Sequence, residues 1–215
     1  EQQLDHPRGI GDLSSQTTND RGQEQPHRSP HQRAWQRTHS AHNDHGDELN
    51  GIEIIRQLIP LLSPTSIAGS LVAVPIVNVP AFMTQSRYLP DRRDLNRSFP
   101  GSKTGSQASR IAHILMDQVV SHCTHLVDLH SASAHRSNAP QVRASLNHRQ
   151  TAEFAEAFGA PFIVHSGERD GSLRMAASGV GVISIVYEAG GAALFDREAI
   201  DIGLLGVLGV MRHLG

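Results

Sequence analysis

His45 and Glu48 lie three residues apart in this 215-residue sequence, and their types and spacing fit a metal site. At a helix start, this separation lets both side chains point the same way. An ordinary explanation stays open, because such pairs are expected by chance in a chain with 14 histidines. His45 could be solvated, and Glu48 could occupy a first helical turn, where a carboxylate suits the helix dipole. The pair alone does not decide between the two.

Two further candidates stand at the ends of predicted strands. The stretch HLVDLH ends in His130, and GVISIVYE ends in Glu188. In open α/β sheets, functional residues collect at the carboxyl ends of strands. A catalytic zinc site has three protein ligands from the histidine and carboxylate pool and one open position for water. His45, Glu48 and His130 would supply the ligands for one zinc ion (Zn²⁺), and Glu188 would remain as a nearby base. For His130 alone, a hydrogen-bonded strand-end histidine is the alternative.

The loop SRYLPDRRDLNRSFPG is rich in groups that bind carboxylates. It contains one asparagine and four arginines, namely Asn96, Arg87, Arg92, Arg93 and Arg97. Guanidinium groups bind carboxylates through paired N–H donors and can polarise carbonyl groups. Taken singly, these arginines would be solvated surface groups.

Four more charged residues are weaker candidates. Asp128 lies two residues before His130 and therefore on the same strand face. It could orient an imidazole or be an ordinary polar group. Arg136, Arg143 and Arg174 could contact a substrate, with a solvated surface position as the alternative.

Helices and strands in alternation are expected to position these residues. Helical spacing of apolar residues, together with Gly and Pro boundaries, predicts helices at 48–62, 106–122, 149–159, 172–179 and 197–214. Apolar, β-branched runs predict strands at 70–79, 125–130, 161–165 and 181–188. No strand pattern is found in QRAWQRTHSAHND, before His45. The alternation predicts a three-layer α/β/α sandwich with a mostly parallel, mixed sheet.

Composition favours one folded domain preceded by a polar segment. Residues 1–40 are crowded with polar side chains and are expected to be disordered or non-native, whereas residues 41–215 are expected to form one folded domain. A net charge of -2 gives no reason to expect nucleic acid or a membrane as partner, and the apolar runs have only strand length. The first thirty residues lack the apolar segment of a signal peptide, and the single Cys123 fits a reducing compartment. These features predict a cytoplasmic protein.

Four motifs in order along the chain are more specific than any one of these residues. HGDELNGIEI, DLNRSFPG, DLHS and YEAGG together resemble the succinylglutamate desuccinylase and aspartoacylase family of zinc hydrolases, over roughly residues 44–215. That family is related in fold to the zinc carboxypeptidases. The resemblance implies a zinc-carboxypeptidase-like fold. It also implies a zinc-dependent hydrolase that cleaves the amide bond of a small molecule, an N-acylated amino acid or a similar carboxylate.

The resemblance also assigns the metal site and the base. By position, His45 and Glu48 match the family's zinc-binding pair, and His130 matches the third ligand. Glu188 matches the glutamate that activates the water and then protonates the leaving amine.

The resemblance also implies substrate-binding roles for residues of the arginine-rich loop. Asn96 and Arg97 match a pair that holds a substrate carboxylate. Arg87 resembles the arginine that polarises the scissile carbonyl, with Arg92 or Arg93 as alternatives.

The sequence departs from the family at both ends. No strand is recognised before the HGDE turn, so His42 competes with His45 as a ligand, although only His45 has a glutamate three residues on. The chain stops at MRHLG, where the family usually continues into a smaller β-rich domain, so the catalytic domain is expected to be truncated at both ends. Two other functions stay open: a zinc carboxypeptidase acting on peptides, and a truncated, non-catalytic relative that binds metal.

Overall fold

The computed structural model of the chain describes residues 38–42, 45–133 and 136–215. Six strands form one sheet in the order β2-β1-β3-β6-β4-β5. The strands are β1 (Thr38–His42), β2 (Ser70–Val74), β3 (His125–His130), β4 (Ser137–Ala144), β5 (Phe162–His165) and β6 (Ile183–Gly191). Neighbouring strands are parallel except for β4 and β6, which are antiparallel. The prediction of a mostly parallel, mixed sheet is confirmed.

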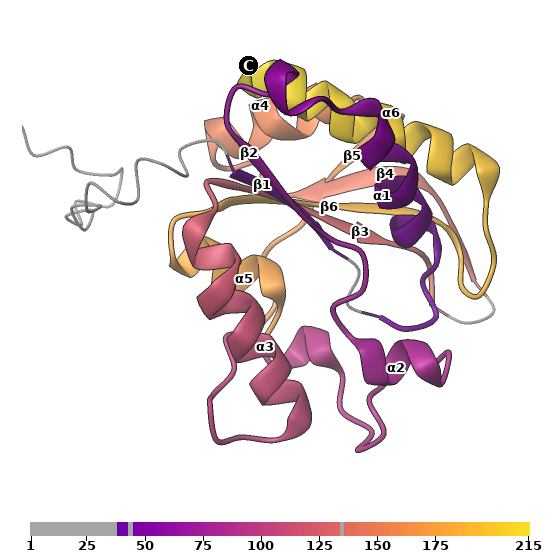
Figure 1. Ribbon diagram of the computed structural model, residues 1–215, viewed down its shortest axis with the longest axis vertical. Helices are drawn as coiled ribbons and strands as arrows, with labels where there is room; N and C mark the ends of the chain where they lie inside the picture. The colour runs from indigo at the N-terminus through magenta and orange to yellow at the C-terminus, as the bar shows by residue number, and fades with distance from the viewer. Residues whose placement is uncertain (1–37, 43–44, 134–135) are drawn as a thin grey trace, which may run out of the picture.

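Helices cover both faces of this sheet (Figure 1). One face carries α1 (Asn50–Leu61), α4 (Arg149–Phe158) and α6 (Arg197–Leu214). The other side carries α2 (Val79–Met83), α3 (Gln107–Gln118) and α5 (Leu173–Gly179). Three short 3-10 turns connect elements, at Pro64–Ser66, Leu95–Arg97 and Val120–His122. The predicted three-layer α/β/α fold is therefore confirmed. Among the described residues, no helix combines the length and apolarity needed to cross a lipid bilayer.

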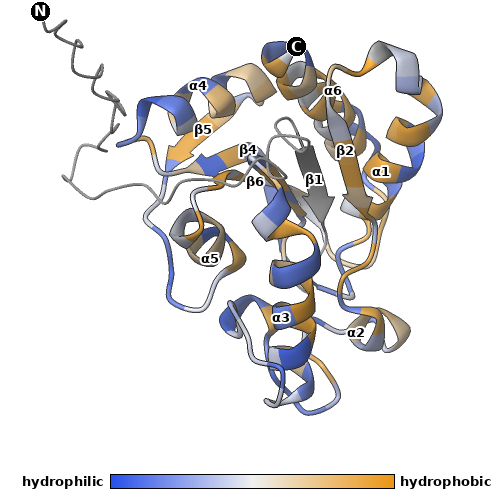
Figure 2. Ribbon diagram, turned by 60° about the vertical axis from the view of Figure 1, so that its left-hand side comes forward, coloured by the Kyte–Doolittle hydropathy of each residue, from blue (hydrophilic) through white to orange (hydrophobic). Residues whose placement is uncertain are grey.

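Two apolar cores lie on opposite faces of the sheet. Figure 2 shows hydrophobic colour along β2 and β5 and hydrophilic segments on α3 and α4. Along β3, Val127 and Leu129 belong to the core under α1, α4 and α6, whereas Leu126 belongs to the core with α3 and α5. Successive strand side chains point to opposite faces. Asp128 and His130 therefore share the face of Leu126, on the side of α3 and α5.

The buried face of α1 differs from the one that apolar spacing predicts. Spacings of three and four in the sequence predict a buried face made of Ile52, Ile55, Leu58, Ile59 and Leu62. Ile55 and Leu58 are buried as predicted, but Ile54 is buried as well, and Ile59 is 52% exposed. The helix is turned in this way because its first residue, Asn50, is itself buried against the ends of β3 and β6. A polar anchor thus sets the orientation of the helix.

The prediction that no strand precedes His45 is wrong. Thr38–His42 forms β1, which pairs in parallel with β2 on one side and β3 on the other. Its sequence, THSAH, contains only one β-branched residue, and pairing on both sides decides its conformation instead. Residues 1–37 lie outside the described residues, so for them the expected disordered or non-native character stays a prediction. Residues 38–40 belong to the sheet.

The strand β4 lies where no element was predicted. Its sequence contains Pro140 and polar residues, and its register with β6 shifts between Asn138 and Gln141. A proline inside a sheet is tolerated at such irregularities because the local ladder is already interrupted. The shift places Asn138 opposite Gly190, next to the end of β6.

The strand β2 is shorter than predicted. It ends at Val74, just before Pro75, which lacks a backbone N–H group. The residues that follow form α2 instead, capped by Asn78, whose side-chain oxygen accepts from the Ala81 N–H at 3.2 Å.

Candidate functional site

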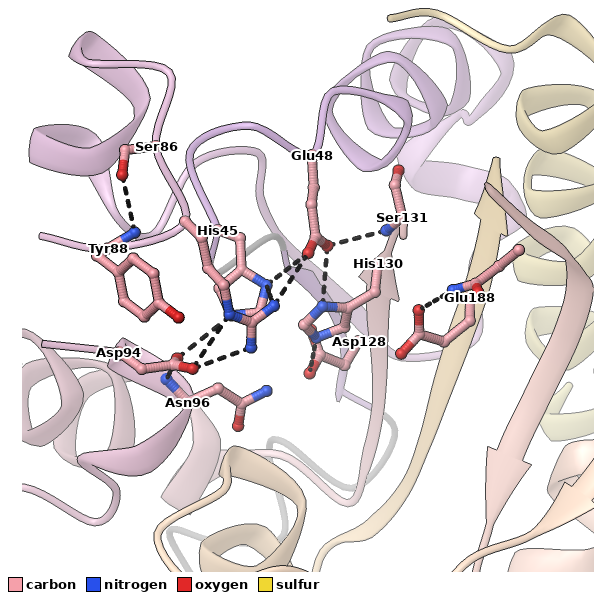
Figure 3. A network of polar contacts seen from close by, with 12 residues as sticks. His45, Glu48, Ser86, Tyr88, Asp94, Asn96, Asp128, His130, Ser131 and Glu188 are labelled. Atoms are coloured by element: carbon pink, nitrogen blue, oxygen red, sulfur yellow. Dashed lines mark hydrogen bonds and ion pairs between the residues drawn. The ribbon is translucent and has the colours of Figure 1, made fainter. Parts of the chain in front are cut away.

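Three ligand-type side chains meet beside the carboxyl ends of β1 and β3. His45, Glu48 and His130 are only 3%, 1% and 5% exposed, and they offer ligand atoms within 4.8 Å of one another (Figure 3). Glu48 lies between the two imidazoles. Its Oε1 is 2.6 Å from His45 Nδ1, and its Oε2 is 2.9 Å from His130 Nδ1. The three residues that the sequence singled out as metal ligands therefore lie together. His42 is the last residue of β1, and its side chain lies outside the described part of the chain.

Each imidazole also faces a carboxylate on its other side. His130 Nε2 is 2.9 Å from Asp128 Oδ2, and His45 Nε2 is 3.3 Å from Asp94 Oδ1. When a cation binds, each imidazole would be neutral, with the hydrogen on Nε2 donated to its carboxylate and the Nδ1 lone pair left for the cation. Carboxylate partners of this kind orient metal-binding imidazoles. Two neutral imidazoles and one carboxylate in a buried site thus fit a divalent ion such as zinc.

Glu48 is held in its ionised form. Burial alone would raise its pKa, but the charges and hydrogen bonds of His130 and His45 outweigh burial and keep the pKa well below its ordinary value. The Ser131 N–H also donates to Glu48 Oε2 at 2.8 Å. An ionised carboxylate is the form that binds a cation.

Asn50 ties the turn that carries two of these residues to the sheet. Its Nδ2 donates to Ser131 Oγ and to the Ala189 carbonyl, both at 3.2 Å. Its Oδ1 accepts from the Asp196 N–H at 2.9 Å. One buried side chain therefore connects α1 to the ends of β3 and β6. Sequence reasoning did not single out Asn50, since its partners lie far away along the chain.

Glycine at position 46 lets the same turn pack closely on α2. The Gly46 N–H donates to the Ser86 carbonyl at 3.1 Å. A Cβ added to Gly46 would lie 2.0 Å from the carbonyl carbon of Ala81, so a larger residue could not be accommodated without moving the backbone.

Glu188 lies next to His130 because β3 and β6 pair in parallel with these two residues opposite each other. Asn138 Nδ2 donates to Glu188 Oε2 at 2.8 Å. Burial raises the pKa of Glu188, and the negative charge of Glu48 adds to the increase, while His130 opposes it. A carboxyl group with a raised pKa can accept and release a proton closer to neutral pH. Asn138 was missed in the sequence, which carries no local signal for its position.

Arg87 reaches this cluster and is held by Asp94. Its Nη2 and Nε donate to Asp94 Oδ2 at 2.9 and 3.2 Å, and its Nη1 is 3.9 Å from Glu48 Oε1. Burial would raise the pKa of Asp94, but His45 and Arg87 together lower it well below its ordinary value. The ionised carboxylate of Asp94 thus contacts both the candidate metal ligand His45 and the guanidinium group of Arg87.

Sequence reasoning also missed Asp94. A signal was present, because its Oδ1 caps the following 3-10 turn by accepting from the Asn96 N–H at 2.9 Å, a usual role for aspartate at that position. Arg92 and Arg93, the alternatives to Arg87, are exposed, and neither is among the described residues that line the cavity over the His45, Glu48 and His130 cluster.

A cavity of about 380 Å³ opens over these groups. Asn96 lines it, and its Oδ1 accepts from the Leu173 N–H at 2.9 Å, which leaves the side-chain nitrogen to donate to a ligand. Six guanidinium groups also line the cavity, those of Arg87, Arg97, Arg136, Arg143, Arg169 and Arg174. Such a cavity suits a small molecule that carries negative charge.

Comparison with known proteins places this arrangement in a family. Residues 42–214 match the succinylglutamate desuccinylase/aspartoacylase catalytic domain. N-alpha-acetyl-L-2,4-diaminobutyric acid deacetylase from Halomonas elongata is 31% identical over an alignment of 180 residues, and the match covers 80% of this chain and 53% of that protein.

Two solved structures show the same fold. A succinylglutamate desuccinylase/aspartoacylase from Rhodobacter sphaeroides is 30% identical, with a TM-score of 0.77, over 84% of this chain and 56% of that one. The product-bound ectoine utilization protein EutE (DoeB) from Ruegeria pomeroyi is 28% identical, with a TM-score of 0.78, over 84% and 58%. This chain thus spans little more than half the length of these relatives. With the catalytic-domain match covering most of its residues, the chain belongs to the succinylglutamate desuccinylase/aspartoacylase family.

Proposed function

We propose that this chain is a zinc-dependent amidohydrolase that cleaves the amide bond of an N-acylated amino acid or a similar small carboxylate. The observation that carries the proposal is the buried cluster of His45, Glu48 and His130 with Glu188 opposite His130 on the neighbouring strand. The name of the Halomonas relative, a deacetylase of an N-acetylated amino acid, supports the same reaction. The cavity of about 380 Å³ lies at the small end of ligand sites, which favours a small substrate over a peptide.

His45, Glu48 and His130 would hold the zinc ion. When bound, zinc would supply Lewis acidity for the attacking water and the scissile carbonyl. The flanking carboxylates of Asp94 and Asp128 keep both imidazoles in the orientation that binding needs.

Glu188 is the proposed general base and acid. Its carboxylate would accept a proton from the attacking water and return it to the nitrogen of the breaking amide, so that the amine can leave. Asn138 holds Oε2 of this carboxylate, and Oε1 remains for the proton. The raised pKa of Glu188 brings proton release closer to neutral pH.

Arg87 and the pair Asn96 and Arg97 are proposed to act on the substrate. Arg87 would donate to the carbonyl oxygen as negative charge develops there, a contribution of about 3 kcal/mol in comparable sites. Asn96 and Arg97 would bind a substrate carboxylate through the amide nitrogen and the guanidinium group.

The proposal is tested by measuring zinc content and hydrolysis together. The purified chain is expected to bind about one zinc ion and to release amine from N-acyl amino acids but not from short peptides. Glu188→Gln should keep the zinc and lose about 10²-fold to 10⁴-fold in turnover, the usual contribution of a general base. Glu156→Gln, at an exposed position on α4, is the matched control. Near-normal turnover in Glu188→Gln would show that the base is wrongly assigned. Bound zinc without any turnover in the unmodified chain would instead identify a non-catalytic relative.

A further inference from the structure

Two of the candidate metal ligands and the proposed base stand on separate elements. His45 and Glu48 belong to the turn before α1, whereas Glu188 lies on β6. The ladder between β3 and β6 fixes Glu188 against His130, but this ladder does not include the turn. A base must lie within hydrogen-bond reach of the proton that it accepts. The contacts that hold the turn against β6 therefore control the geometry of the reaction.

The side-chain amide of Asn50 makes three of these contacts. Nδ2 donates to Ser131 Oγ and to the Ala189 carbonyl, each at 3.2 Å, and Oδ1 accepts from the Asp196 N–H at 2.9 Å. An amide nitrogen has two hydrogens to donate, so both are used here. The residue is only 1% exposed. A buried polar group whose partners are all present holds its neighbours in one arrangement.

Two of the three partners adjoin groups that would take part in the reaction. Ala189 directly follows Glu188 on β6. Ser131 donates its backbone N–H to Glu48 Oε2 at 2.8 Å (Figure 3). Asn50 itself lies two residues after Glu48 in the sequence. One amide therefore connects the backbone beside the base with the carboxylate at the centre of the candidate metal site.

The loop after β6 packs tightly on the same side chain and on the same turn. A Cβ added to Gly190, which has a φ of 70°, would lie 2.6 Å from Asn50 Nδ2. Ala193, with a φ of 57°, donates its N–H to the Asp47 carbonyl at 2.6 Å. A residue other than glycine keeps a positive φ only where its surroundings hold it there. The loop and the turn are thus fixed against each other at two points.

We infer that Asn50 is a positioning residue that sets the separation between Glu188 and the metal cluster of His45, Glu48 and His130. The inference rests on the proposed function. Asn50 is not among the described residues that line the cavity, so it acts through Ala189 and Ser131 and not by touching the substrate. A misplacement of about 1 Å between reacting groups can lower a rate by about 100-fold.

Asn50→Ala removes all three hydrogen bonds and tests the role directly. The assay uses the best substrate from a panel of N-acetylated amino acids, at saturating zinc and well below the Tm of the variant. We expect kcat to fall by about 10-fold to 100-fold, with KM within about 3-fold and about one zinc ion per chain. Asn50→Leu restores a branched side chain without hydrogen-bonding groups, so a loss in both variants reports the bonds and not the filled space. Asn147→Ala, at an exposed position, is the control and should keep kcat.

A double-mutant cycle with Glu188→Gln separates positioning of the base from general damage to the site. If Asn50 acts through Glu188, its replacement has little left to disturb once the base is gone. In the Glu188→Gln chain, Asn50→Ala should therefore lower the residual kcat by less than about 3-fold. Loss of packing or of the metal site would instead lower kcat by the same factor in both chains.

Equal losses in the two chains would overturn the positioning role, as would a kcat in Asn50→Ala and Asn50→Leu that stays within about 3-fold of the unmodified chain. If the unmodified, zinc-loaded chain hydrolyses none of the N-acetylated amino acids, the proposed function fails. The position of Glu188 is then judged by crystal structures of the unmodified chain and of Asn50→Ala. A change of about 1 Å or more in the separation of the Glu48 and Glu188 carboxylates would support the role, and an unchanged separation would overturn it.

Discussion

Replacing Asn138 by alanine should move the pH dependence of the reaction. Asn138 Nδ2 donates to Glu188 Oε2 at 2.8 Å, and this bond stabilises the ionised carboxylate. Burial already raises the pKa of Glu188 above its ordinary value of 4.5. Loss of the donor removes one of the contacts that favour ionisation, so the pKa should rise further.

The size of the shift follows from the bond that is lost. A hydrogen bond to a charged group contributes about 1.5–3 kcal/mol when buried. Asn138 is only half-buried, and water can replace part of the bond, so the lower end of the range applies. Because 1.36 kcal/mol corresponds to one pKa unit, the pKa of Glu188 should rise by about one unit.

The assay is the pH profile of kcat/KM for an N-acyl amino acid. A base must be ionised, so activity is present above the pKa of Glu188 and is lost as the pH falls through it. In Asn138→Ala, this acid limb should lie about one pH unit higher, whereas the plateau above it should change little. Asn147→Ala, at an exposed position in the turn after β4, is the control and should leave the limb in place.

An acid limb that stays at the same pH in Asn138→Ala would refute the reasoning. It would mean that the limb reports a group other than Glu188, or that the bond does not form in solution. A loss of activity equal at every pH would point to a structural effect of the substitution, and the assignment of Glu188 as the titrating base would lose its support.

Three further predictions concern the metal cluster and its turn. Asp94→Asn should weaken zinc binding by about 10-fold to 100-fold, because Asp94 contacts His45 Nε2 and orients this imidazole. Competition with a chelator measures the zinc affinity. An unchanged affinity would show that Asp94 does not position His45. Removal of zinc with a chelator should lower the Tm by about 8–16 °C. A ligand at about 1,000 times its Kd stabilises the folded state by about 4 kcal/mol. In a chain of this size, each kcal/mol corresponds to about 2–4 °C in Tm. An unchanged Tm after treatment with the chelator would argue against zinc bound by His45, Glu48 and His130. Gly46→Ala should lower the free energy of unfolding in urea by at least about 1–3 kcal/mol because of the contact with Ala81, whereas Gly179→Ala, with open space around it, should not.

The side chains that would carry the chemistry could be identified from the sequence because few residue types can perform it. His130 ends β3, and Glu188 lies three residues before the end of β6, which continues past the predicted boundary to Gly191. Apolar residues mark both strands in the sequence, and parallel pairing places His130 and Glu188 side by side. His45 and Glu48 were identified by spacing at a helix start and by the motif around them. The alternating order of the remaining helices and strands was enough to predict three layers.

The strands β1 and β4 could not be identified in this way. The sequences THSAH and SNAPQVRA have little intrinsic preference for a strand, and each is held between two neighbouring strands. Only the alternation of Val142 and Ala144, both buried, gives a weak local signal in β4. Tertiary pairing decided the conformation of both segments.

Supporting residues were missed for a related reason. Asn50 and Asn138 are small polar residues of common type, and their partners lie 81 and 50 positions away. Nothing in the neighbouring sequence distinguishes them from surface asparagines. Their importance arises only when the ends of β3 and β6 are brought against α1 and β4.

The pairing of β3 with β6 fixes the relative position of two side chains more firmly than that of the residues around them. A one-residue slip along this ladder would turn either His130 or Glu188 to the opposite face, so their spacing is preserved by the backbone itself. Arg143 and Arg174 line the same cavity but stand on separate supports, β4 and α5. Substitutions at these two positions would therefore change the lining of the cavity while His130 and Glu188 stay in place.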